Sequence, residues 1–126
     1  MIIDTNWHVL VVDDQEPMQK IVQGLLKRLG LVNTTTALNG KAAWHILNKE
    51  HIDFIVCDIN MPVMNGLEFL EKVRGDDRFA KIPFLMVTAE ADKDTVVKAV
   101  ELGVSSYILK PLTPVTFEKK LTEMFG

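Results

Sequence analysis

Short apolar runs alternate along the chain with segments in which apolar residues recur every three or four positions. The runs predict five strands, at residues 8–13, 33–38, 53–58, 82–88 and 104–109. Pro17 and Pro114 suit first helical turns, whereas Gly30 and Gly103 suit helix ends. The periodic segments therefore predict five helices: one from Pro17 to Gly30, three over 40–48, 66–73 and 92–102, and one from Pro114 onward.

The strict alternation of strands and helices predicts an α/β fold, with a parallel sheet covered by helices on both faces. Central strands of such a sheet are apolar throughout, as residues 9–12, 54–57 and 84–87 are. Residues 33–38 and 104–109 include Thr or Ser and suit the edges. This distribution favours the strand order 2-1-3-4-5 of flavodoxin-like (βα)5 folds. No repeat or linker interrupts the pattern, so we expect residues 1–126 to form one domain.

Composition and charge exclude several classes of function. The net charge is −3, which argues against non-specific binding to nucleic acids, because such binding requires clustered Lys and Arg. No apolar run approaches the roughly 20 residues of a membrane span, and the first residues carry Asp4 instead of a basic signal-peptide region. The single cysteine, Cys57, cannot form an internal disulfide. These features fit a protein of the reducing cytoplasm.

Five polar residues stand where expected strands end. Asp13 and Asp14 follow the first strand, Asp58 the third, Thr88 the fourth, and Lys110 the fifth. The carboxyl ends of parallel strands share one edge, so these residues should converge there. Clustered carboxylates repel one another unless a cation is present, and Mg²⁺ prefers their oxygen atoms. The cluster therefore predicts a Mg²⁺ site beside a phosphate site, although each residue taken singly is more simply explained as a cap, turn former or solvated charge.

Four segments carry a family resemblance: LVVDD (10–14), CDINMPVMNG (57–66), MVTAEA (86–91) and ILKP (108–111). In order and spacing they resemble the signature segments of response-regulator receiver domains, and most of all those of single-domain chemotaxis regulators. The resemblance covers nearly all of residues 7–125. It implies that Asp58 is the phosphoacceptor. It also implies that Asp13, Asp14, Asp58 and the backbone carbonyl of Asn60 bind Mg²⁺.

The resemblance further implies a switch. Thr88 would contact the phosphoryl group, Lys110 would pair with it, and the ring of Tyr107 would turn inward as Thr88 moves. A cis peptide is implied between Lys110 and Pro111. The domain would act as a phosphoacceptor signalling switch, self-catalysing only its own phosphorylation and dephosphorylation.

The same resemblance names partners. A histidine kinase would donate the phosphoryl group, and self-catalysed hydrolysis, tuned at Asn60 and Glu90, would remove it, with a separate phosphatase as a further candidate. The implied output in chemotaxis is docking of a monomer to the flagellar motor switch, through a face that includes Lys120.

The segment 92–102 carries more apolar residues than one buried helical stripe needs. We expect Val97 to face the core and Val96 and Val100 to be exposed, where an apolar patch can bind a partner. An ordinary wide core face is an equal alternative. The candidate partner face comprises Val96, Val100, Val104, Tyr107 and Lys120.

Alternative functions stay open at this point. Four residues depart from the pattern of chemotaxis receivers: Gln15, Glu16, Ile59 and Glu123. These departures favour a stand-alone receiver for another partner, such as a phosphorelay intermediate or phosphate sink. A receiver excised from a longer regulator is a further alternative. An Asp-nucleophile phosphatase of the haloacid dehalogenase class would need a second carboxylate where this chain has Asn60. A flavin-binding module would need a phosphate loop after the first strand, where the acidic residues would repel a phosphate.

Other residues are assigned no part in this chemistry. Cys57 should point away from the acidic edge and pack in the core. The spacing of His8, His45 and His51 fits no zinc site. The charged stretch 74–78 (RGDDR) is expected to be a solvated loop.

Overall fold

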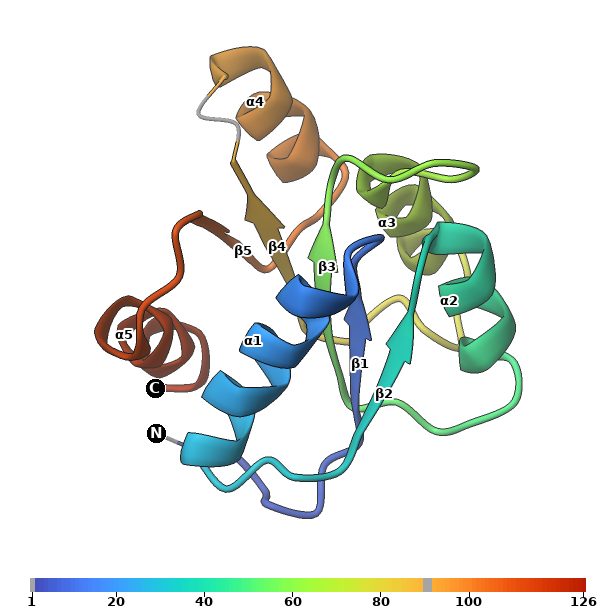
Figure 1. Ribbon diagram of the computed structural model, residues 1–126. Coiled ribbons are helices and arrows are strands. Elements are labelled where there is room, and N and C mark those ends of the chain that lie inside the picture. Colours follow the sequence, from blue (N-terminus) through green and yellow to red (C-terminus); the bar gives the residue numbers. More distant parts are fainter. Residues whose placement is uncertain (1, 90–91) are drawn as a thin grey trace.

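A five-stranded parallel sheet forms the centre of the molecule, in the order β2-β1-β3-β4-β5 (Figure 1). The computed structural model describes residues 2–89 and 92–126, so Glu90 lies outside the described residues. The strands are β1 (Val9–Val12), β2 (Thr34–Ala37), β3 (Phe54–Asp58), β4 (Phe84–Thr88) and β5 (Ser106–Leu109). The predicted strand order is confirmed, with the two Thr- and Ser-containing strands at the edges.

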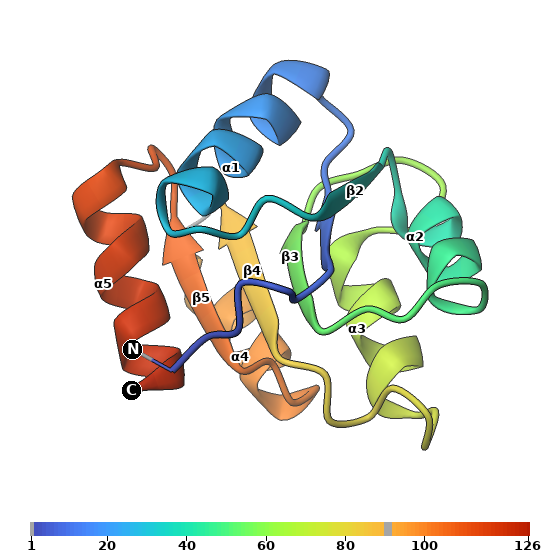
Figure 2. The same ribbon diagram turned by 90° about the horizontal axis from the view of Figure 1, so that it is seen from below.

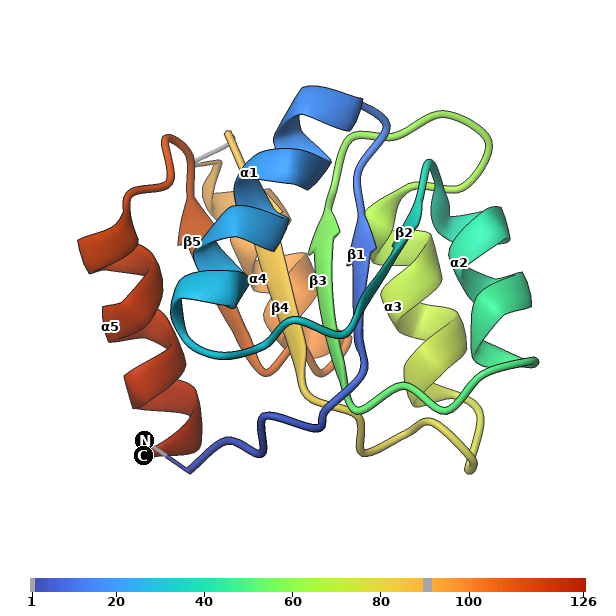
Figure 3. The same ribbon diagram turned by 60° about the horizontal axis from the view of Figure 1, so that its bottom comes forward.

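In the described part of the chain, five helices cover the two faces of the sheet. They are α1 (Glu16–Arg28), α2 (Gly40–Leu47), α3 (Gly66–Arg74), α4 (Lys93–Glu101) and α5 (Pro114–Phe125). Figures 2 and 3 show α1 and α5 on one face and α2, α3 and α4 on the other. None of the helices in the described ranges has the length and apolar character needed to cross a membrane.

Local sequence explains where several elements begin and end. Asn65 caps α3 by accepting from the Glu68 N–H at 2.9 Å, and Glu68 accepts in return from the Asn65 N–H at 3.1 Å. Gly30 follows α1 with φ of 86°, a conformation that glycine adopts without strain. Strand β4 begins two residues later than predicted, after Pro83, which has no N–H to donate to a sheet.

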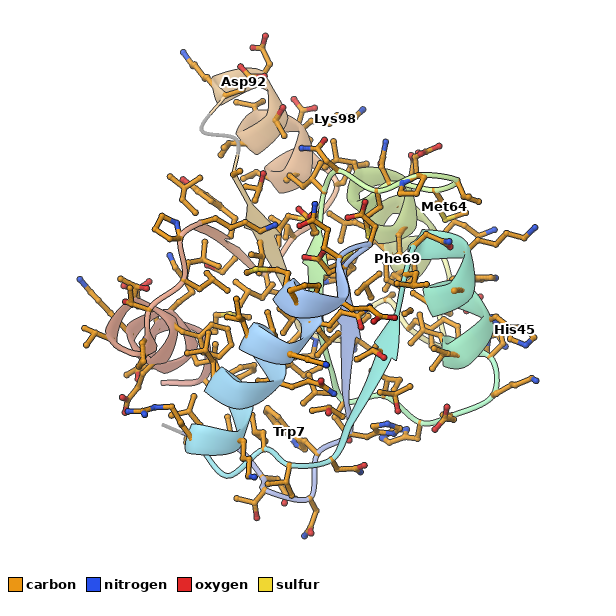
Figure 4. The ribbon with its side chains drawn as sticks, viewed as in Figure 1. Trp7, His45, Met64, Phe69, Asp92 and Lys98 are labelled. Atoms are coloured by element: carbon orange, nitrogen blue, oxygen red, sulfur yellow. The ribbon has the colours of Figure 1, made fainter. Side chains whose placement is uncertain are left out.

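Apolar side chains fill the space on both sides of the sheet. One core lies under α2 and α3 and includes the fully buried Phe69 and Phe84. The other lies under α1 and α5 and includes Phe54 and Phe117. Trp7, at the amino end of the sheet (Figure 4), packs its ring 5.1 Å from that of Phe125 and so closes the second core. These two cores pack against both faces of the sheet and so fix the positions of the strand ends.

Helix α4 corrects one prediction about the apolar surface. Val97, expected to face the core, is 44% exposed, whereas Val96 is half-buried. Ala99 is the buried residue of this helix, and Val96 lies one turn before it on the same side. Val100 is 60% exposed, as expected. The inward side of α4, at the upper end of the molecule in Figure 1, is therefore formed by Ala99 and Val96, whereas Val97 and Val100 face outward.

Arg74 corrects another prediction, because it is not part of a freely solvated loop. Its guanidinium donates to the carbonyl oxygens of Gly103 at 2.8 Å, Ile82 at 2.8 Å and Ala80 at 3.2 Å. It also donates to Ser105 Oγ at 3.3 Å. Partial burial lowers the pKa of this guanidinium. Arg74 thus joins the end of α3 to the segments that lead into β4 and β5.

Candidate functional site

Three carboxylates meet at the carboxyl edge of the sheet. Asp13 and Asp14 follow β1, and Asp58 ends the neighbouring β3. One oxygen atom from each of the three lies within 4.8 Å of the others. Asp13 and Asp58 are buried and Asp14 is exposed, so the cluster opens to solvent on one side. The predicted convergence of these residues is therefore observed.

Lys110 supplies a positive charge to the same cluster. Its Nζ lies 3.3 Å from Asp58 Oδ2 and 3.7 Å from Asp13 Oδ2. The position of Lys110 is set by the sheet, because its backbone N–H donates to the Thr88 carbonyl at 2.8 Å. One ammonium faces three carboxylates, and the cluster keeps an excess of negative charge that a cation would balance.

The electrostatic cost of the cluster is visible at Asp13. Burial raises the pKa of the Asp13 carboxyl, and the nearby Asp58 and Asp14 charges raise it further. The Gln15 N–H, which donates to Asp13 Oδ1 at 2.9 Å, and the Lys110 charge act in the opposite direction. The net direction is upward, so ionised Asp13 is destabilised in the metal-free protein.

The backbone around Asp58 fixes the direction of its carboxylate. The Ile59 N–H donates to Asp58 Oδ1 at 2.8 Å, which leaves Oδ2 toward Lys110. Gly66 lies directly behind: its N–H donates to the Ile59 carbonyl at 2.8 Å. A Cβ at Gly66 would overlap the Asp58 carbonyl oxygen. The sequence gives no signal of this contact, because a glycine that opens a helix gives no sign of what packs against it.

The remaining residues expected at the site lie at or near the same edge. Thr88 is buried at the end of β4, one residue beyond the Val87 that pairs with Asp58. Asn60 is exposed, two residues past Asp58. The Lys110–Pro111 peptide is cis, as the resemblance implied.

Gln19 is a residue of the site region that sequence reasoning missed. It is buried in α1, and its side-chain amide donates to the Asp13 carbonyl at 2.8 Å and to the Ala37 carbonyl at 3.2 Å. A signal was present, because position 19 falls on the inward stripe of α1 with Val22 and Leu26, where a polar residue is unusual.

The donor set of the acidic cluster fits a hard divalent cation. Three carboxylates offer the oxygen ligands that Mg²⁺ prefers, and the exposed side of the cluster leaves room for water. No sulfur or imidazole ligand belongs to the cluster, which argues against zinc.

Cys57 is fully buried in the core and its pKa is raised by burial, as expected of a packing residue. His45 lies on the outer side of α2 (Figure 4).

The candidate partner face draws its residues from α4, β5 and α5. Tyr107 is 37% exposed, and Lys120 Nζ lies 5.8 Å from the centre of its ring. The same Nζ lies 3.3 Å from Glu123 Oε2. A cleft of about 400 Å³ runs between the two elements and is lined by Tyr107, Ile108, Leu109, Thr116, Lys119, Lys120 and Glu123. Of the other members, Val100 is exposed, whereas Val96 and Val104 are half-buried.

Known proteins resemble this chain in sequence and in fold. The family model described as response regulator receiver domain matches residues 9–122. Chemotaxis protein CheY-3 of Vibrio cholerae is 41% identical over 124 residues, which cover 98% of this chain and 95% of that protein. Chemotaxis protein CheY of Pseudomonas aeruginosa is 41% identical over 117 residues, which cover 93% and 94%. The structure of chemotaxis response regulator CheY4 of Vibrio cholerae matches with a TM-score of 0.85 at 32% identity, covering 94% of this chain and 98% of that one.

The matched segment includes all the candidate site residues, from Asp13 to Lys120. Sequence, fold and the acidic edge of the sheet thus agree with the family resemblance and with its chemotaxis branch. The chain belongs to the response regulator receiver domain family of two-component signalling proteins.

Proposed function

We propose that Asp58 accepts a phosphoryl group from a histidine kinase, with Mg²⁺ bound by Asp13, Asp14, Asp58 and the backbone carbonyl of Asn60. The observation that carries this proposal is the position of Lys110 Nζ, 3.3 Å from Asp58 and 3.7 Å from Asp13. This one ammonium balances only part of the negative charge of the three carboxylates. A purely structural ion pair would need one carboxylate, whereas this site gathers three. Residues 1–126 would act as one receiver unit.

The chain's own residues prepare the transfer. Asp58 Oδ1 is held by the Ile59 N–H, so Oδ2 is the oxygen that would attack. The new bond joins Oδ2 to phosphorus while the bond from phosphorus to the histidine nitrogen of the kinase breaks. Lys110 would balance charge on the phosphoryl oxygens, and Thr88 would donate its hydroxyl to one of them. A bound Mg²⁺ would neutralise further charge on the same oxygens.

Signalling would follow from a change in the partner face. As Thr88 moves toward the phosphoryl group, Tyr107 would leave its exposed position beside Lys120 and turn inward. The cleft between β5 and α5 would then change shape. The chain would act as a switch reset by self-catalysed hydrolysis or by a phosphatase, with Asn60 and Glu90 tuning the decay.

Two outputs fit this face. The chemotaxis relatives support docking to the flagellar motor switch. The ion pair between Lys120 and Glu123 favours a different partner. Lys120 is the residue expected to bind the motor switch, and its ammonium is already paired with the Glu123 carboxylate within this chain. Binding of a motor-switch peptide by the wild type and by Glu123→Gln separates the two. Tighter binding by the variant supports the motor, and absence of binding by both supports another partner.

The phosphoryl chemistry is tested by incubation with acetyl phosphate, followed by intact mass measurement. We expect a gain of one phosphoryl group that requires Mg²⁺ and is absent in Asp58→Asn. Because rapid hydrolysis could hide the product, beryllofluoride binding is measured in parallel as a stand-in for the phosphoryl group. A wild type that binds neither phosphoryl nor beryllofluoride in the presence of Mg²⁺ would disprove the proposal.

A further inference from the structure

Gln19 makes an unusual pair of hydrogen bonds at the ends of two strands. The residue is 6% exposed, and both hydrogens of its amide are used on backbone carbonyls, those of Asp13 at 2.8 Å and Ala37 at 3.2 Å. Burial of a primary amide is unfavourable unless its donors are satisfied. Two backbone carbonyls at this position thus receive hydrogen-bond donors that an apolar side chain could not supply.

The β1–β2 ladder ends beside Gln19 and leaves the Asp13 carbonyl without a backbone donor from β2. The Asp13 N–H donates to the Ala37 carbonyl at 3.0 Å, which is the last rung between β1 and β2. In a continued parallel ladder, the Asp13 carbonyl would accept next from the backbone N–H of residue 39. The chain turns away there, because Asn39 caps α2. The Gln19 amide takes the place of the missing donor.

The consequence falls on the metal site. The Asp13 carbonyl belongs to the peptide unit that joins Asp13 to Asp14, and that unit sets where both side chains begin. Asp14 is exposed, and two like charges lie within 4.8 Å of it. The hydrogen bond from Gln19 fixes the oxygen of this peptide unit, and with it the starting direction of both side chains, in a place where like charges repel.

We propose that Gln19 is a positioning residue for the cation site, acting by holding the peptide between Asp13 and Asp14. This inference rests on the proposed function, since the cation that benefits is the one proposed there. The two hydrogen bonds of Gln19 go to backbone carbonyls and not to the carboxylates that would bind the cation. Its contribution is to keep the acidic pair in the arrangement that binds a divalent ion.

Gln23 provides a matched control. It lies one turn further along α1, is half-buried, and donates through its side chain to Thr34 Oγ1 at 2.9 Å, at the opposite end of β2. Gln19→Met and Gln23→Met therefore remove the same chemical group from the same helix. Gln19→Asn is a second variant that keeps the amide but is one methylene too short to reach both carbonyls.

Two measurements test the inference. Calorimetric titration with Mg²⁺ should show binding weakened roughly fivefold in Gln19→Met and Gln19→Asn, the scale of one hydrogen bond, and unchanged in Gln23→Met. In the metal-free protein, the amide resonance of residue 14 should shift in both Gln19 variants and not in Gln23→Met. Unchanged Mg²⁺ binding in the Gln19 variants, or equal weakening in Gln23→Met, would overturn the inference.

The metal-free spectra keep the two proposals distinguishable. If the wild type binds no Mg²⁺, the proposed metal site fails, and a role for Gln19 toward the cation fails with it. If the wild type binds Mg²⁺ while the amide of residue 14 is the same in every variant, the metal site stands and the positioning role is wrong.

Discussion

Lys110 and Thr88 are joined by a backbone hydrogen bond of 2.8 Å, from the lysine N–H to the threonine carbonyl. The ammonium that faces Asp58 and the hydroxyl expected to contact the phosphoryl group are therefore carried by hydrogen-bonded residues at the carboxyl ends of β4 and β5, with Lys110 one residue beyond the pair Thr88 and Leu109. A movement at the end of β4 would be transmitted directly to the end of β5. This link gives the proposed switch a short path from Asp58 to the exposed Tyr107.

Removal of the Lys110 charge should separate metal binding from phosphoryl transfer. In Lys110→Met the cluster loses its only cation among the described contacts, so Mg²⁺ should bind about three- to tenfold more tightly. Phosphorylation by acetyl phosphate should nevertheless slow by roughly 100-fold, because a group that stabilises the transferring oxygens is gone. Calorimetry and the rate of mass gain measure the two effects. Lys119→Met, on α5, is the control, and equal Mg²⁺ affinity in both variants would contradict the prediction.

Asp13→Asn should stabilise the metal-free protein at neutral pH. Burial raises the pKa of Asp13 above its ordinary value of 3.8, so the folded state holds this proton more tightly than the unfolded state. The favourable contribution is present below that value and is lost as the pH rises through the folded pKa. Thermal melting without Mg²⁺ should show the variant more stable than the wild type at pH 7, with the difference vanishing near pH 3. Asp77→Asn, at an exposed position, is the matched control, and an equal gain in stability from both substitutions would contradict the prediction.

Gly66→Ala should be strongly destabilising. The new methyl group would overlap the Asp58 carbonyl oxygen and lie 2.9 Å from Ile59 Cα, and neither backbone atom can move without displacing the phosphoacceptor. We expect a loss of about 3 kcal/mol or more in the free energy of unfolding, measured in urea. Gly24→Ala in α1 meets no atom within 4 Å and should stabilise by about 0.5–1 kcal/mol. A Gly66→Ala protein as stable as the wild type would show that the β3–α3 connection yields easily.

Arg74→Ala should cost about 2–4 kcal/mol of stability, because four acceptors lose a charged donor. Arg78→Ala removes an arginine from the same stretch whose pairing with Asp76 lies at the surface, so it should leave the free energy of unfolding nearly unchanged. Urea unfolding of both variants makes the comparison. Hydrogen exchange of the amides near Gly103 should also quicken only in Arg74→Ala. Similar effects of both substitutions would mean that the Arg74 contacts add little.

The elements and the acidic edge were predictable because both depend on local patterns. A run such as residues 54–57 is apolar on every side chain, and a carboxylate directly after it must lie at the sheet's edge. Which side of α4 packs against the core was not predictable. Its valines allow two orientations of the helix about its axis, and only the packing of Ala99 selects one. Arg74 was misjudged for a similar reason: Ala80 and Ile82 lie in the loop after α3, whose path the sequence does not reveal, and Gly103 is 29 residues away along the chain.

The contact between the two ends of the chain bears on how the protein can be engineered. The Ile2 N–H donates to the Phe125 carbonyl at 2.9 Å, and both lie at the end of the sheet remote from Asp58 (Figure 3). A short flexible linker could join residues 2 and 125 without strain, and new ends could be opened in an exposed turn. Fluorescent reporters attached at either existing end would stand away from the acidic cluster. Such fusions would leave the phosphodonor free access to the site.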